Sequence, residues 1–107
     1  GDLAGVPRIR RDRDARLLEY SAVWLERAHK AGVPFALGTD SGFAVTPFGE
    51  FHARELEDLQ RYAGMTALEA ITAGTRNGAR MMGHDGELGE VRVGALADLL
   101  VVDGDPA

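Results

Sequence analysis

Apolar and small side chains recur every three or four positions along Arg13–Ala31, which predicts an amphipathic helix. The stripe consists of Leu17, Ser21, Trp24, Leu25 and Ala28. Gly32 follows the last turn, in the place where a glycine commonly ends a helix. His29 adjoins this end, where the helix dipole favours a positive imidazole, and we prefer this role for His29 to that of a metal ligand.

A short apolar run after this helix predicts a buried strand. Val33–Leu37 shows no polar alternation, as is typical of a parallel strand covered on both faces. The run leads into Gly38–Gly42, a glycine-flanked loop that carries one carboxylate, Asp40. Because chemistry in α/β proteins gathers at the carboxyl ends of strands, Asp40 is the foremost candidate for a functional residue. An Asp that closes a turn or caps a helix is the simpler interpretation, and spacing alone favours it.

A second amphipathic helix is predicted over Glu50–Ala63. Its inward stripe consists of His52, Leu56, Leu59 and Ala63. His52 begins this stripe soon after the Asp40 loop, so it could face the same cavity as Asp40. A partly buried, hydrogen-bonded histidine at a helix start is the simpler interpretation. The irregular stretch Phe43–Gly49 between the two could border a pocket.

Local signals then predict two more helical pieces. Gly64 and Met65 form a normal helix stop. Thr66–Glu69 has the form of a capping box and opens a helix that runs to about Ala73. A further turn or short helix stops at Gly83 and carries two methionines, which we expect to fill the core rather than bind a ligand. These are Met81 and Met82, and His84 beyond them is expected to be exposed.

The end of the sequence changes to a strand pattern. Glu90–Val93 alternates and Leu99–Val102 is apolar and partly β-branched, with a possible turn at Gly94-Ala95. An isolated hairpin is marginal in water, so these strands need partners. Exposed strand edges here and at Phe35–Leu37 would favour self-association into a homo-oligomer.

Composition narrows the class of protein. With 107 residues and 45% hydrophobic content, the sequence is one domain or a piece of one. The net charge of −5 argues against binding of nucleic acid, which needs a concentrated basic surface. The absence of cysteine excludes disulfides, thiolate nucleophiles and cysteine-based zinc sites. No apolar run is long enough for a membrane span, and no signal-peptide pattern is present, so we expect a cytoplasmic protein.

Several short stretches form one pattern through their order and spacing. They are Ala28–Val33 running into Leu37–Gly42, then Glu55-Leu56, Ala63–Thr66, Leu68–Ala70, Asn77–Ala79, Gly83, Gly89, Gly94, Ala97–Leu99 and Asp103–Pro106. Over roughly residues 15–107, this pattern resembles the end of the barrel in the amidohydrolase superfamily of metal-dependent hydrolases. Within that superfamily, the imidazolonepropionase-like and prolidase-like branch is the most similar.

The resemblance implies an α/β fold. The chain would hold the last helix–strand–helix segment of a (β/α)₈ TIM barrel and strands of a small composite β-domain, and it would be mostly helical in isolation. Residues 1–83 would be the C-terminal part of the barrel, with strand 8 near 33–39 and the following helices within 50–83. Residues 84–107 would supply strands of a partial β-sandwich.

The resemblance also implies a chemistry. Such enzymes hydrolyse a C–N bond in an amide, cyclic amide or dipeptide-like small molecule, with a divalent metal, here expected to be zinc, that activates water. Asp40 matches the residue that binds metal and shuttles a proton from water to the leaving nitrogen, a double role that suits a carboxylate. Ser41, Gly42 and His52 are candidates for the wall of the substrate pocket.

The departures from the family pattern are equally informative. The His-x-His pair, the metal-bridging lysine and the later histidine ligands have no match, since only His29, His52 and His84 are present. A zinc site needs three or four protein ligands, and a barrel takes about 250 residues. We therefore expect the C-terminal part of a larger hydrolase, inactive and without bound metal by itself. The alternative is a free-standing, non-catalytic helical module for self-association or partner binding.

Overall fold

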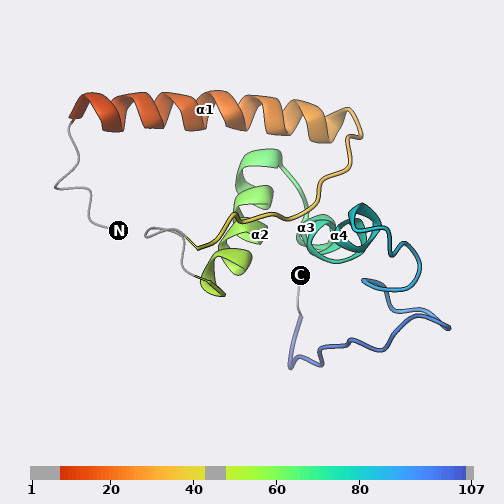
Figure 1. The fold of residues 1–107 in the computed structure, drawn as a ribbon. Helices are drawn as coiled ribbons and strands as arrows, with labels where there is room; N and C mark the ends of the chain where they lie inside the picture. Colours follow the sequence, from red (N-terminus) through yellow and green to blue (C-terminus); the bar gives the residue numbers. More distant parts are fainter. Residues whose placement is uncertain (1–7, 43–47, 106–107) are drawn as a thin grey trace.

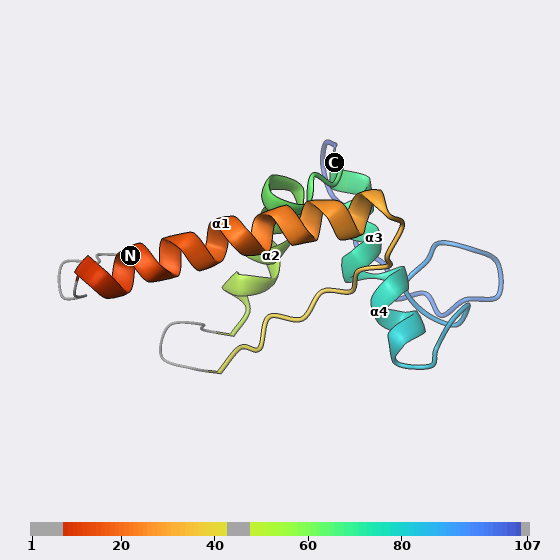
Figure 2. The same ribbon diagram turned by 90° about the horizontal axis from the view of Figure 1, so that it is seen from above.

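The fold is a group of helices crossed by one extended segment. The structure is a computed structural model that describes residues 8–42 and 48–105, with side chains from residue 15 onward. The helices in these ranges are α1 (Arg8–Lys30), α2 (Glu50–Ala63), α3 (Ala67–Gly74) and α4 (Arg76–Met81). α1 packs on α2, α2 on α3, and α3 on α4. Residues 33–42, the extended segment, run back from the end of α1 past α3, α4 and α2 (Figures 1 and 2).

α1 confirms the predicted first helix and begins a few residues earlier than expected. The Gly32 N–H donates to the His29 carbonyl at 2.9 Å and the Val33 N–H to the Ala28 carbonyl at 3.0 Å, which is the Schellman pattern. Gly32 has a φ of 77°, a left-handed conformation that glycine adopts without strain. The predicted stripe is only partly covered, because the N-terminal turns of α1 extend beyond α2 (Figure 1). Trp24 remains 49% exposed.

The predicted connection between α2 and α3 is also confirmed. Gly64 ends α2 in a left-handed conformation with a φ of 70°, and Met65 behind it is buried. Thr66 then caps α3. The Glu69 N–H donates to Thr66 Oγ1 at 3.3 Å, and the Thr66 N–H donates to Glu69 Oε2 at 2.8 Å, which completes the capping box.

The core is small. It consists of Leu59, Ala63, Met65, Ala70 and Ala73, with Leu25, Phe35 and Leu56 packed partly against it. The accessible surface is 8596 Å², whereas a compact monomer of this mass exposes about 5,800 Å². The radius of gyration is 16.3 Å, compared with about 13 Å for a compact domain of this length. The chain therefore buries much less surface than a self-sufficient domain does.

The helical part of the predicted fold is present, whereas the strands are not. Within the described residues, the segments predicted as strands, at 33–39, 90–93 and 99–102, contain no strand pairing. Beyond the hydrogen bond of Val33 at the end of α1, the extended segment makes one backbone hydrogen bond to a helix within the described residues, from the Leu37 N–H to the Ala73 carbonyl at 3.2 Å. A strand is defined by the neighbour it pairs with, and the described residues offer none. The strand assignments and the division at residue 83 therefore stay predictions.

The prediction that both methionines of the last helix fill the core is wrong. Met81 is 70% exposed and Met82 is 63% exposed, and of α4 only Ala79 is buried. The helix turns its small residue inward, so the longer side chains at its end face solvent. His84 is exposed, as predicted. No helix in the described part of the chain is long and apolar enough to cross a membrane.

Candidate functional site

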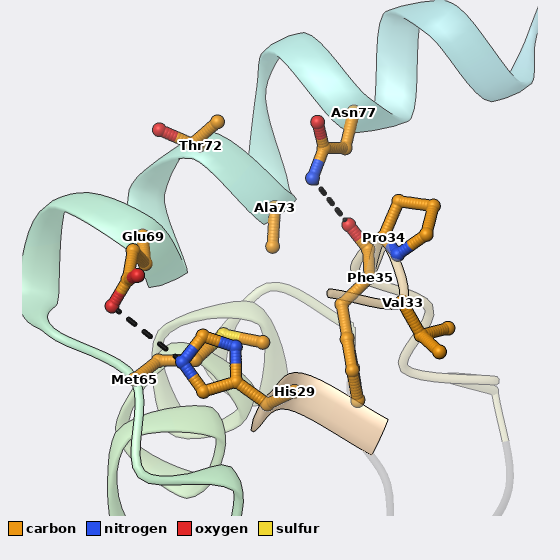
Figure 3. A pocket seen from close by; sticks show the side chains of 9 residues that line it. All are labelled: His29, Val33, Pro34, Phe35, Met65, Glu69, Thr72, Ala73 and Asn77. Carbon is orange, nitrogen blue, oxygen red and sulfur yellow. Dashed lines mark hydrogen bonds and ion pairs between the residues drawn. The ribbon is translucent and has the colours of Figure 1, made fainter. Parts of the chain in front are cut away.

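Beyond Val33, three hydrogen bonds join the extended segment to three different helices. Asn77 Nδ2 of α4 donates to the Phe35 carbonyl at 2.7 Å, and the Leu37 N–H donates to the Ala73 carbonyl of α3 at 3.2 Å. The Gly38 N–H donates to Glu55 Oε1 of α2 at 3.0 Å. Figure 3 shows the first of these contacts. The helices thus determine the path of the backbone that leads to Asp40.

Asp40 follows this held stretch in the loop Gly38–Gly42, which we call the Asp40 turn. Its φ is 47°, the left-handed region, which Asp tolerates better than most residues because its short side chain can hydrogen-bond locally. The N-cap of α2 is Gly49, so Asp40 does not cap that helix. Asp40 is exposed, and the flanking hydroxyls of Thr39 and Ser41 lie 2.7 Å apart in a hydrogen bond. The turn therefore presents the Asp40 carboxylate to solvent.

The predicted pocket residues lie in two places. Ser41 is half-buried beside Asp40, and Gly42 has a φ of 122°. A Cβ at Gly42 would lie 3.2 Å from the ring of Phe48, so this glycine allows the ring to approach closely. His52 is exposed, and its predicted place on the buried stripe of α2 is wrong. Leu56, Leu59 and Ala63 keep their predicted places on the covered face of α2, and Glu55 also lies partly buried there. The role of Ser41, Gly42 and His52 in a pocket wall stays a prediction.

A separate cavity of about 160 Å³ lies at the other end of the extended segment. Figure 3 shows the lining residues, which come from the end of α1, the start of the segment, the connection between α2 and α3, and α3 and α4. His29 Nε2 lies 3.7 Å from Glu69 Oε2. The rings of His29 and Phe35 pack edge-on, with 6.5 Å between their centroids. The hydrogen bonds from the Thr66 backbone and hydroxyl lower the pKa of Glu69, and His29 adds a smaller effect in the same direction. His29 is thus engaged away from the Asp40 turn.

The donor set of the described residues does not form a metal site. Among residues 8–42 and 48–105, no group of three or more His, Cys, Asp or Glu side chains could hold a metal ion. Of the other histidines, His84 Nδ1 lies 3.0 Å from Glu87 Oε2, and His52 is exposed on α2. A zinc site requires three or four ligands. The residues that the structure describes therefore hold no complete metal site by themselves, and the role of Asp40 as a metal ligand stays a prediction.

Sequence reasoning missed two residues that shape the Asp40 turn. Glu55 is charged and lies outside the predicted inward stripe of α2, yet it lies four residues before the buried Leu59 and accepts the Gly38 N–H. Asn77 carries no signal in the sequence apart from its place in the family pattern. The periodicity could have identified Glu55, since residues four apart share a helix face.

Together these features define a helical unit built around a loop that presents a carboxylate. Comparison with known proteins identifies its class: the amidohydrolase family model matches residues 5–107, and the chain belongs to the amidohydrolase family. This confirms the family resemblance of the sequence. No solved structure gave a significant match to the chain.

Individual relatives share a limited region. The chain is 38% identical over 79 residues to an imidazolonepropionase of Aeromonas hydrophila, covering 73% of this chain and 19% of that protein. It is 37% identical over 82 residues to a 5-methylthioadenosine/S-adenosylhomocysteine deaminase of Thermoanaerobacter pseudethanolicus, covering 71% and 19%. It is 41% identical over 80 residues to an ochratoxinase of Aspergillus niger, covering 74% and 16%. The matched region is thus less than a fifth of each relative.

Proposed function

We infer that this chain is the C-terminal part of a metal-dependent amidohydrolase that hydrolyses C–N bonds in amide, cyclic amide or dipeptide-like small molecules. The observation that carries the proposal is Asp40, an exposed carboxylate in a left-handed turn at the end of the extended segment, inside the region matched by the family. Membership of the amidohydrolase family supports the reaction class. The name of one relative, a deaminase, also indicates chemistry at a C–N bond.

In this proposal Asp40 transfers a proton from the attacking water to the leaving group. Its carboxylate accepts a proton from the attacking water and returns it to the leaving nitrogen, which a positioned carboxylate can do as a general base and then a general acid. Asp40 would also be one ligand of a divalent metal, zinc in our proposal, whose chemistry is to polarise water and the substrate carbonyl. Ser41, Gly42 and His52 would border the substrate.

The remaining ligands would come from outside the residues of this chain. The described residues hold no complete donor set, and the matched region covers 16% to 19% of the three relatives named above. The large accessible surface supports the same proposal, since the helices would bury much of it against the rest of a barrel. We therefore expect this chain alone to be inactive.

The proposal is tested by Asp40→Asn in the natural polypeptide that carries this sequence. Turnover is measured on a panel of dipeptides, N-acyl amino acids and cyclic amides, through the amine released. We expect turnover to fall by at least 10²-fold, about the lower limit of what a general acid–base group contributes, while the fold stays intact. The matched control is Asp58→Asn, the same change at an exposed Asp of α2. Near-normal turnover of Asp40→Asn would refute the assignment.

A second candidate function is self-association by a non-catalytic module. The observation that favours it is the exposure of apolar side chains near the C-terminus, where Val93 is fully exposed and Val101 is 99% exposed. The intact mass of the natural polypeptide, measured from its source cells, separates the two candidates. A mass near 11.5 kDa would favour the module, and a mass several times larger would favour the hydrolase.

A further inference from the structure

Glu55 makes the tether closest to Asp40. Its Oε1 accepts the Gly38 N–H at 3.0 Å, two residues before Asp40, whereas Asn77 holds the Phe35 carbonyl, five residues before it. Glu55 reaches the segment from α2, across 17 positions of sequence. A displacement of Gly38 passes directly to Asp40, because only Thr39 lies between them. Glu55 is thus the side chain best placed to determine where the Asp40 carboxylate lies.

The burial of the Glu55 carboxylate lowers the stability of the fold, which is unexpected for a residue whose role is stability alone. Glu55 is partly buried, and its Oε2 is buried without a hydrogen-bond partner among the described residues. A buried carboxylate oxygen without a donor is unfavourable, and an apolar side chain of similar size would avoid the penalty. In return, a charged acceptor makes a stronger hydrogen bond to a backbone N–H than a neutral one does. The desolvation penalty of the carboxylate is thus offset in part by its hydrogen bond to the Gly38 N–H.

We propose that Glu55 is a positioning residue for Asp40, which acts by holding the Gly38 N–H and thereby the turn that presents the Asp40 carboxylate. This inference rests on the proposed hydrolase function for its effect on turnover. Its structural part, the hydrogen bond from the Gly38 N–H to Glu55, depends only on the observed geometry.

Two variants of Glu55 separate positioning from support of the fold. Glu55→Met keeps a side chain of similar length and lacks the acceptor, whereas Glu55→Gln keeps an acceptor oxygen and removes the charge. Glu57→Ala, an exposed Glu on the same helix, is the control. In the natural polypeptide, we expect Glu55→Met to lower kcat by about 10- to 100-fold, as losses of residues that orient a ligand do, with KM within about twofold. Glu55→Gln should restore kcat in part, to a value between those of Glu55→Met and the unaltered protein, because a neutral amide oxygen accepts a weaker hydrogen bond than a carboxylate does.

Amide hydrogen exchange at Gly38 is the second readout, and it does not depend on catalysis. We expect the Gly38 amide to be protected in the unaltered protein and in Glu57→Ala, largely protected in Glu55→Gln, and unprotected in Glu55→Met. An unprotected Gly38 amide in the unaltered protein would overturn the inference even if Glu55→Met failed to fold. So would unchanged kcat in Glu55→Met, or an equal loss of kcat in Glu55→Gln and Glu55→Met.

The two proposals can fail separately. If Asp40→Asn keeps normal turnover, the hydrolase assignment fails, and Gly38 exchange alone then decides whether Glu55 holds the turn. If Asp40→Asn is inactive while Glu55→Met keeps full turnover, the hydrolase assignment stands and the positioning role of Glu55 is refuted.

Discussion

Gly89 provides the sharpest test of the packing, because it touches the junction between α3 and α4. A Cβ at this position would lie 2.7 Å from the carbonyl carbon and oxygen of Thr75 and 2.9 Å from the Cα of Arg76. These are backbone atoms, which cannot rotate away. Gly89 also has a φ of 76°, a conformation that L side chains rarely adopt. Gly89→Ala therefore meets both a conformational penalty and a steric one.

Gly94→Ala measures the conformational penalty without the steric one. Gly94 also has a positive φ, 94°, but a Cβ there would meet nothing within 4 Å. The left-handed conformation costs Ala about 1–2 kcal/mol at either position. Forcing the backbone at Gly89 away from Thr75 adds about 1–3 kcal/mol, the usual range for overpacking. We therefore expect Gly89→Ala to destabilise the turn by about 2–5 kcal/mol and Gly94→Ala by about 1–2 kcal/mol.

Amide hydrogen exchange of Leu96 in the natural polypeptide measures the difference. The Leu96 N–H donates to the Glu87 carbonyl at 2.9 Å across this turn, so its exchange reports local opening. The additional penalty at Gly89 corresponds to exchange about 5- to 150-fold faster than in Gly94→Ala. Equal exchange in the two variants would refute the steric argument and mean that the turn does not pack on the α3–α4 junction as described.

Two further predictions concern the capping box and the extended segment. The hydrogen bonds with Thr66 lower the pKa of Glu69. The contribution of the Glu69 carboxylate to the stability of α3 is therefore complete above the ordinary pKa of 4.5 and is lost as the pH falls through the lowered pKa. Amide exchange in α3 should therefore accelerate as the pH falls below 4.5 and through the lowered pKa of Glu69, and Glu69→Gln should remove this dependence; a Gln variant with the same profile would contradict the assignment. Asn77→Asp replaces the donor to the Phe35 carbonyl with an acceptor and should weaken the hold on the segment by about 1–3 kcal/mol, seen as faster exchange of the Leu37 amide. Unchanged Leu37 exchange in this variant would mean that Asn77 does not hold the segment.

The helices, the ends of α1 and α2 and the start of α3 were predictable from the sequence because their signals are local. The Gly32 stop, the Gly64 stop and the capping box at Thr66 each depend on hydrogen bonds between residues at most six positions apart. Such contacts form wherever the short sequence allows them, so propensity and spacing are sufficient. The loop that carries Asp40 was recognisable for the same reason, through its flanking glycines.

The burial of particular side chains was less predictable. The periodicity of α2 predicts His52 on the buried stripe and leaves Glu55 outside it, whereas the structure exposes His52 and partly buries Glu55. Met81 and Met82 are apolar in sequence and exposed in the fold. A helix period determines which residues share a face, but the neighbouring element determines which face is covered.

By itself, the sequence determined the helices, their caps, the family and the choice of Asp40 as the candidate carboxylate. Only the tertiary structure decided what holds that carboxylate in place. Glu55 and Gly38 are 17 positions apart, and Asn77 and Phe35 are 42 apart. Hydrogen bonds over such separations leave no periodic trace in the sequence, since they arise only when packing of the helices brings the two partners together.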